Sequence, residues 1–235
     1  MRIYGLKRPI LVDCADVAPV GDTGYVACES CHYYISYPKP TKRIVEWLEG
    51  SDTVCSFVWP ARLVAEVLVT QEVRDAIQDC EVEFLPVEFY QDPKLKKPKR
   101  ITKRTKPRIW LPYEGPPLYD LWVTRWAHAD LEHSSLHLVE TCPACGHKVY
   151  EVEGIEERKH RYDPVKKGLV EIHTPRKEGQ GIYVHPNNLA GAEIFRLHEL
   201  PGWILCTERV KAVIEDRGFT NVWFLEVGNI LSVPS

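Results

Sequence analysis

The segments Cys28-Glu29-Ser30-Cys31 and Cys142-Pro143-Ala144-Cys145-Gly146 decide how this chain is expected to fold. A Cys-x-x-Cys turn places two sulfurs about one turn apart, so that both thiolates can bind one tetrahedral zinc ion. Gly146 gives the second turn the backbone freedom to direct its amides toward the sulfurs. We therefore predict one structural zinc ion per chain, which joins distant parts of the sequence through four ligands: Cys28, Cys31, Cys142 and Cys145.

Other uses of these cysteines remain open from the sequence. His32 and His147 each follow a pair directly and could act as substitute ligands. The thiols can also stay without metal, or one pair can be a redox centre of the thioredoxin type. Such a centre needs a helix after the motif, whereas residues 33–38 are typical of extended chain. The remaining cysteines have no partner at ligand spacing, so we expect them to be small core residues: Cys14, Cys55, Cys80 and Cys206.

The composition indicates a folded, soluble protein. Of the 235 residues, 44% are hydrophobic and 27% are charged, which excludes a disordered chain. No stretch approaches the ~20 apolar residues that a bilayer crossing needs, and residues 1–9 carry charges where a signal peptide is apolar. Eight cysteines are too few for a secreted disulfide framework. We therefore expect a cytoplasmic protein without a membrane partner, in a compartment where paired cysteines favour metal; the sequence does not indicate its oligomeric state.

A basic segment interrupts an otherwise acidic chain. The net charge is −3, but residues 94–108 contain no acidic residue and nine basic ones: Lys94, Lys96, Lys97, Lys99, Arg100, Lys103, Arg104, Lys106 and Arg108. Pro98 and Pro107 and the lack of apolar periodicity favour an exposed connector. We therefore expect an N-terminal half at 1–92, a connector at 93–109 and a C-terminal half at 110–235, the halves packing as one unit through the shared zinc site.

Two similar stretches predict strand-helix-strand units. Residues 68–79 followed by 84–87 resemble residues 205–216 followed by 224–227, with Thr70 and Thr207 placed as helix N-caps. Either an internal duplication or the chance similarity of two amphipathic helices explains this. Elsewhere we expect a short helix at 42–49 and strands at 131–139 and 169–172. The predicted fold class is α+β, stapled by zinc, with mixed sheets of short strands and two similar strand-helix-strand units.

No catalytic set is evident, so we predict that the protein is not an enzyme. His128, His133 and His137 cluster before the second cysteine pair, but the carboxylate motif of a catalytic metal site is missing, which favours surface or hydrogen-bonded histidines. A metalloenzyme that uses these histidines would need a second metal site with an open position. The sequence also lacks a Gly-x-Ser-x-Gly motif, a phosphate-binding glycine loop and a dinucleotide fingerprint.

The chain resembles the double-CXXCG motif family of bacterial proteins, which is best represented in myxobacteria and includes immunity proteins against polymorphic (swarm-inhibition) toxins. The matching features occur in order along most of the chain: the first pair with residues 37–38, then 117–121, the second pair, 192–197, 207–210 and Phe224. His32 replaces the glycine of the first motif, and the basic segment replaces a part that is usually rich in glycine and proline. The resemblance implies a cytoplasmic protein that binds and neutralises a cognate toxin.

The alternative function is that of a zinc-stabilised nucleic-acid-binding protein. Its contacts would come from the basic segment: Lys96, Lys97, Lys99, Arg100, Lys103 and Arg104. This segment has no aromatic residue for base stacking before Trp110, and the acidic remainder of the chain would repel phosphates. Immunity by protein binding is therefore the first hypothesis, and nucleic acid is the less favoured partner.

Overall fold

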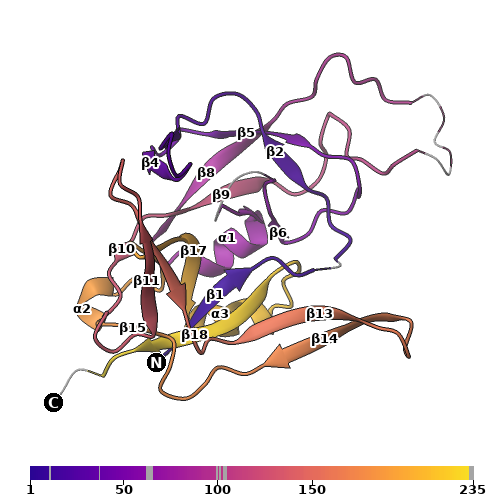
Figure 1. The fold of residues 1–235 in the computed structure, drawn as a ribbon. Helices are drawn as coiled ribbons and strands as arrows, with labels where there is room; N and C mark the ends of the chain where they lie inside the picture. Colours follow the sequence, from indigo (N-terminus) through magenta and orange to yellow (C-terminus); the bar gives the residue numbers. More distant parts are fainter. Residues whose placement is uncertain are drawn as a thin grey trace. The chain divides into compact units, whose positions relative to one another are not determined.

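The computed structural model describes residues 1–10, 12–36, 38–61, 66–98, 100, 102 and 105–232 (Figure 1). Strands make up 40% of the structure and helices 9%, so the predicted α+β class is wrong and the protein is mostly β. Residues 43–47 and 182–184 alternate between buried and partly buried positions, which suits strands that bury one face, whereas residues 68–70 and 194–197 are buried throughout. None of the helices in the described ranges is long and apolar enough to cross a membrane.

The chain divides into two compact units that do not follow the sequence in two simple halves. The first unit comprises Met1–Lys7, Arg125–Ala212 and Trp223–Ser235, and the second comprises Arg8–Thr124 and Val213–Val222. The division predicted from the sequence ran at 93–109, whereas this segment lies inside the second unit. The difference arises because the first strand of the chain pairs with strands from its last third, which a reading along the sequence does not reveal.

The first unit is built on a six-stranded sheet (Figure 1). Its strand order is β10 (Trp126–Ala127), β16 (Ile194–Leu197), β17 (Leu200–Thr207), β1 (Arg2–Lys7), β18 (Trp223–Ile230) and β15 (Ile182–Val184). Its core includes Ile3, Phe195 and Leu205. Gly228 lies where a side chain would overlap the carbonyl of Ile182, so only glycine allows β15 and β18 to approach. The short helix α2 (Pro186–Leu189) follows β15.

Two hairpins extend the first unit. One consists of β11 (Leu136–Thr141) and β12 (Lys148–Val152), and the other of β13 (Glu157–Asp163) and β14 (Gly168–Thr174). The strand expected at 131–139 starts only at Leu136. The Asp130 side chain accepts hydrogen bonds from the amides of Glu132 and His133, and these bonds hold a turn before the strand. The strand expected at 169–172 is confirmed within β14.

The second unit contains another six-stranded sheet. Its strand order is β2 (Val17–Pro19), β5 (Arg43–Trp47), β8 (Val82–Phe89), β9 (Leu118–Val123), β7 (Leu68–Thr70) and β6 (Phe57–Val58), and a separate hairpin pairs β3 (Val26–Ala27) with β4 (Tyr34–Ser36). The helix expected at 42–49 is wrong, since β5 occupies this stretch. Arg43, Val45 and Trp47 are buried while Ile44 and Glu46 are less so, which is the two-residue period of a strand.

The two predicted strand-helix-strand units are confirmed. The first runs through β7, α1 (Gln71–Ile77) and β8, and the second through β17, α3 (Glu208–Asp216) and β18. In each, the two strands lie on either side of one antiparallel strand, which is β9 for β7 and β8 and β1 for β17 and β18. Thr70 is the N-cap residue of α1, but its side chain makes no capping hydrogen bond.

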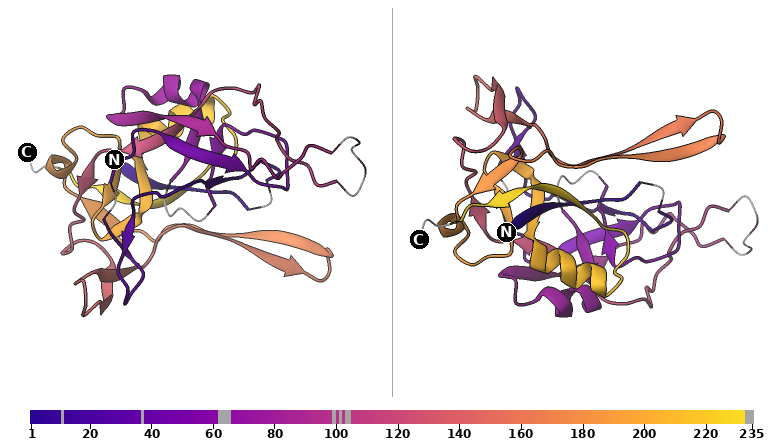
Figure 2. Two further views of the ribbon diagram at one scale, coloured as in Figure 1. Left: turned by 90° about the horizontal axis from the view of Figure 1, so that it is seen from above. Right: turned by 90° about the horizontal axis from the view of Figure 1, so that it is seen from below.

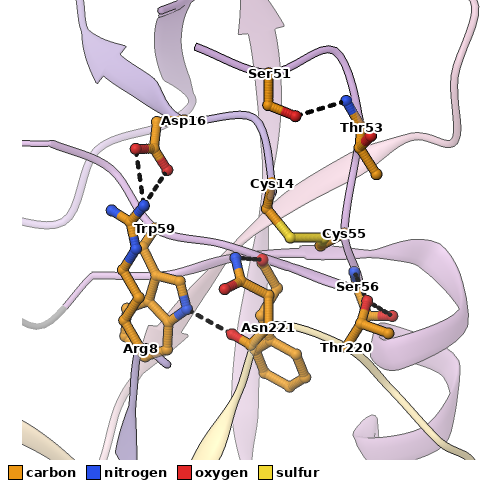
Figure 3. Close-up of a disulfide and its surroundings, with 11 residues drawn as sticks. Arg8, Cys14, Asp16, Ser51, Thr53, Cys55, Ser56, Trp59, Thr220 and Asn221 are labelled. Carbon is orange, nitrogen blue, oxygen red and sulfur yellow. Dashed lines mark hydrogen bonds and ion pairs between the residues drawn. A yellow bond between two sulfur atoms is a disulfide. The ribbon is translucent and has the colours of Figure 1, made fainter. Parts of the chain in front are cut away.

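A disulfide joins two of the cysteines that we expected to be unpaired core residues, which corrects that prediction. Cys14 and Cys55 lie 41 residues apart in the sequence and are bonded to each other (Figure 3). Near the bond, the indole of Trp59 donates to the carbonyl of Asn221, and the Asn221 amide donates to the carbonyl of Phe57. The fold brings Cys14 and Cys55 together through loops, and no short motif marks such a pair. Cys80 and Cys206 are buried as expected.

Candidate metal centre

Each Cys-x-x-Cys pair lies at the end of a β-hairpin. Cys28 and Cys31 lie between β3 and β4, and Cys142 and Cys145 lie between β11 and β12. The expectation of extended chain after the first pair is met by β4, although Tyr37 lies outside the described residues. The thioredoxin-type alternative requires a helix at this position, where the structure has a strand.

The two turns have the same hydrogen bonds. The amide of Cys28 donates to the carbonyl of Tyr33 at 2.8 Å, and the amide of Cys142 donates to the carbonyl of His147 at 2.8 Å. Four residues after each first cysteine, an amide turns back to that cysteine's carbonyl, from His32 at 2.8 Å and from Gly146 at 2.9 Å. Both pairs therefore adopt one turn type, in which the backbone folds around the sulfurs.

The fifth position of each turn has a left-handed backbone conformation. Gly146 has a φ of +73°, as the sequence suggested, and His32 has a φ of +58°. A residue with a Cβ rarely adopts this conformation, whereas glycine does so freely. His32, which occupies the position that Gly146 has in the second turn, therefore keeps the same turn geometry at the cost of backbone strain on one residue.

The four sulfurs form one group. The Sγ atoms of Cys28, Cys31, Cys142 and Cys145 all lie within 4.8 Å of one another. Four sulfurs bound to a zinc ion at about 2.3 Å are about 3.8 Å apart in a tetrahedron, so the group has the dimensions of such a shell. Cys28 and Cys142 are buried and Cys31 and Cys145 are partly exposed. The predicted convergence of the four cysteines is confirmed.

The histidines next to the pairs are not part of this group. Within the ranges that the structure describes, its ligand atoms are the four sulfurs alone. His32 is exposed, and burial lowers the pKa of His147. The substitute-ligand alternative thus receives no support from the geometry.

The three histidines before the second pair bind different carboxylates. His128 Nδ1 lies 2.9 Å from Glu199 Oε1, His133 Nδ1 lies 3.0 Å from Asp130 Oδ2, and His137 Nε2 lies 3.6 Å from Glu153 Oε2. In the described part of the chain they form no common metal-binding group. Glu199 and Asp130 were not marked by any motif, and only the fold shows that they position these rings.

The second unit also contains a buried ion cluster that no sequence pattern indicates. Arg43 Nε donates to Asp120 Oδ2 at 2.9 Å, and Arg43 Nη2 lies 2.9 Å from Glu66 Oε2. Burial acts to lower the pKa of Arg43, but the charges of Asp120 and Glu66 outweigh it and raise the pKa. The hydroxyl of Tyr25 contacts the same carboxylate, Glu66. Because these side chains are enclosed and bind one another, the cluster serves the structure of β5 and β9.

The basic segment is only partly described. Lys96, Lys97 and Arg100 are exposed, while Lys99, Lys103 and Arg104 lie outside the described residues. Beside the segment is a cavity of about 610 Å³ whose lining includes three cations and two aromatic rings: Lys97, Lys106, Arg108, Trp110 and Tyr113. The guanidinium of Arg108 lies 5.7 Å from the centre of the Trp110 ring, and burial raises the pKa of Tyr113 to about 12.

Comparison with known proteins adds no family assignment. No model of a protein family matches the chain, and no curated protein matches it in sequence.

Proposed function

We propose that the four cysteines bind one zinc ion per chain and that this ion is structural. Thiolate sulfur is a preferred ligand of zinc, and a shell of four leaves no position for water or substrate. The observation that carries this proposal is the convergence of four sulfurs from two turns with the same hydrogen bonds. Since the ligands come from segments far apart in the sequence, metal binding would contribute directly to the free energy of folding.

From the resemblance to the double-CXXCG motif family, we further propose that the protein is a non-enzymatic immunity protein that binds and neutralises a cognate toxin. An inhibitor of this kind needs a rigid surface rather than reactive groups, and a closed metal shell gives rigidity without a catalytic centre. In the described ranges, the histidines before the second pair are bound to carboxylates and form no open metal site. These features support a binding protein over a metalloenzyme.

We propose that this protein acts in the cytoplasm, where a toxin delivered from a neighbouring cell would be met. The disulfide between Cys14 and Cys55 bears on this point, because cytoplasmic thiols are usually kept reduced. Thiol labelling of protein taken from cells under denaturing, acid-quenched conditions tests it. If Cys14 and Cys55 react with the label, their thiols are reduced in the cell, as expected in the cytoplasm. If they do not react, they are joined as a disulfide, which would indicate an oxidising compartment instead.

The immunity function is tested by co-expression with the product of the adjacent gene. We expect cells to survive when the chain is present, and the two purified proteins to form a complex with a nanomolar-class dissociation constant. The matched variants are Cys28→Ser, which removes a zinc ligand, and Cys80→Ser, which removes a buried cysteine outside the group. Protection lost with the first and retained with the second would support a zinc-dependent fold. Absence of both binding and protection with the unchanged chain would contradict the proposal.

A second candidate function, nucleic-acid binding, is favoured by one observation. The cavity beside the basic segment is lined by the cations of Lys97, Lys106 and Arg108 and by the ring of Trp110, which is a combination that proteins use to bind single-stranded nucleic acids. A labelled single-stranded oligonucleotide tests it. Binding that weakens steeply with salt and is lost with Trp110→Ala would support this function, and salt-independent or absent binding would remove it.

A further inference from the structure

The hairpin of β13 and β14 is a two-stranded ribbon that is exposed along much of its length. The strands pair in an uninterrupted register from Glu157 opposite Thr174 to Asp163 opposite Gly168. Figure 2 shows this ribbon, in orange, extending away from the strands β1 and β18 of the same unit. A two-stranded ribbon without a covering layer gains little from burial, so its length calls for another explanation.

Large apolar side chains are exposed on this ribbon. Tyr162 is 59% exposed, Leu169 is 50% exposed and Val165, at the turn, is 89% exposed. Tyr162 and Leu169 are directly opposite each other in the register and therefore share one face. Side chains of this size that gather on a protein surface commonly mark an interaction site, and tyrosine is enriched among the residues that contribute most to binding.

The base of the ribbon is fixed to the first unit. Glu156 Oε2 accepts a hydrogen bond from the backbone amide of Glu226 at 2.7 Å. Glu156 Oε1 lies 2.7 Å from His173 Nε2 and accepts a hydrogen bond from Arg158 Nε at 3.2 Å. The ring of His160 stacks on the ring of Trp223 with centroids 5.8 Å apart. These contacts hold the half of the ribbon nearest the sheet and leave the far half uncovered.

The turn at the end of the ribbon is also ordered by its own hydrogen bonds. Asp163 Oδ1 accepts the amide of Val165 at 2.8 Å and that of Lys166 at 3.1 Å. A surface that is already ordered before binding loses less conformational entropy when a partner arrives. The turn at the far end of the ribbon is therefore already ordered in the free protein.

The charge of the ribbon differs in sign from that of the whole chain. Lys166 and Lys167 are exposed at the turn, Arg161 is exposed on the face opposite Tyr162, and the carboxylate of Asp163 accepts hydrogen bonds within the turn. The chain as a whole carries a net charge of −3. Cations around exposed apolar side chains are complementary to an acidic surface that has an apolar depression.

We propose that the far half of this ribbon, residues 161–170, is the surface that docks on the toxin, and that it binds an apolar pocket rimmed by carboxylates. Tyr162 and Leu169 fill the pocket, Val165 at the turn contacts its edge, and Lys166 and Lys167 pair with the rim. This inference rests on the proposed immunity function. A protein partner fits better than a nucleic acid, because the exposed surface includes the large apolar side chains of Tyr162, Val165 and Leu169, whereas a phosphate backbone is bound mainly by cations.

The test measures the affinity of the full chain for the product of the adjacent gene. The double variant Tyr162→Ala with Leu169→Ala is compared with the control Leu131→Ala, which truncates a side chain that is 52% exposed but lies outside the ribbon. We expect the double variant to weaken binding at least about tenfold and the control to change it less than about twofold. Circular dichroism and zinc content equal to those of the unchanged chain would show that both variants are folded.

Charge reversal separates the two parts of the proposed contact. Lys166→Glu with Lys167→Glu is expected to slow association at low salt and to have a smaller effect at high salt. The proposal is overturned if the toxin binds the unchanged chain and both ribbon variants equally, in which case the immunity function still stands. It is also overturned if the ribbon instead mediates salt-dependent binding to duplex DNA or self-association that the double variant abolishes. If the unchanged chain neither binds nor protects, both proposals fall.

Discussion

His32 and Gly146 occupy the same position in two turns of one geometry, and this makes them a natural test of the metal centre at the residue scale. Their φ values are +58° and +73°, and only glycine adopts such values without a steric cost. The sequence predicted the role of Gly146 from its place after a cysteine pair. It did not show whether His32 would open the first turn, since that depends on how much strain the surrounding hydrogen bonds can hold.

Replacement of the strained histidine should stabilise the protein. We expect His32→Gly to raise the free energy of unfolding by about 0.5–1 kcal/mol, because the relief of backbone strain exceeds the added entropy of the unfolded chain. Gly146→Ala should lower it by about 1 kcal/mol, although no atom lies within 4 Å of the added Cβ. Urea unfolding of the zinc-loaded proteins measures both. If both variants had the free energy of unfolding of the unchanged chain, residues 32 and 146 would not be held in the left-handed conformation.

Loss of one sulfur should remove the metal. We expect Cys28→Ser and Cys145→Ser each to reduce bound zinc from one ion per chain to nearly none and to lower the free energy of unfolding by at least about 3 kcal/mol. Cys80→Ser should keep its zinc, because its sulfur is not part of the group. Metal analysis after gel filtration measures the first effect and urea unfolding the second. Full zinc content in a ligand variant would contradict the assigned shell.

At the scale of elements, the similarity of the two strand-helix-strand units extends beyond their sequences. In both, the strands before and after the helix flank one antiparallel strand, yet that strand follows the unit in one case and comes from the N-terminus in the other. The two units therefore share their topology as well as the spacing of their buried residues. The buried stripes, Val73 with Ile77 and Val210 with Ile214, were readable because they recur at helical spacing.

The stretch at 42–49 shows why other elements could not be predicted. Its apolar residues fit a helix as well as a strand, and the buried position of Arg43 has no signature in the local sequence. The position follows from two carboxylates, Asp120 and Glu66, that belong to distant segments. Since pairing between distant strands decides most of this fold, the local patterns predicted the units with helices and missed the mostly β architecture.

Glu156 should make the stability of the ribbon base depend on pH. Burial acts to raise the pKa of this carboxyl, but hydrogen bonds from the Glu226 amide, Arg158 and His173 outweigh it and hold the pKa below its usual value. A carboxyl with a lowered pKa stabilises the fold above the pKa of the unfolded chain, and this contribution disappears as pH falls through the folded value. We therefore expect Glu156→Gln to cost about 2 kcal/mol at pH 7 and progressively less below about pH 4.5.

Urea unfolding of this variant and of the unchanged chain across that pH range measures the difference. Glu157→Gln is the matched control, because Glu157 is the next residue and is exposed at the start of β13, and it should change the free energy of unfolding by less than about 0.5 kcal/mol. A cost for Glu156→Gln that is the same at pH 7 and pH 3.5 would show that the loss comes from packing rather than from the charge.

At the scale of the whole molecule, two cross-links of different chemistry connect distant parts of the sequence. One is the disulfide between Cys14 and Cys55, and the other is the proposed zinc shell. The sequence predicted the second from the spacing within each pair, which is a local signal. It could not predict the first, because two single cysteines 41 residues apart are recognisable as partners only when the fold has brought them together.

The disulfide should contribute measurably to stability. A bond that closes a loop of this length restricts the unfolded chain, and we expect the double variant Cys14→Ser with Cys55→Ser to lower the free energy of unfolding by about 2–4 kcal/mol. A thiol-free reductant should bring the unchanged chain to the level of the variant and leave the variant unaffected. A reductant that destabilises both equally would be acting on the metal centre instead.

The most direct test of this account is X-ray absorption at the zinc edge of the purified full chain, combined with its metal content. Four sulfurs at the dimensions found here should give one zinc ion per chain with four sulfur neighbours at about 2.3 Å. A chain that binds no metal, or a metal surrounded mainly by nitrogen and oxygen, would contradict the proposed structural zinc centre.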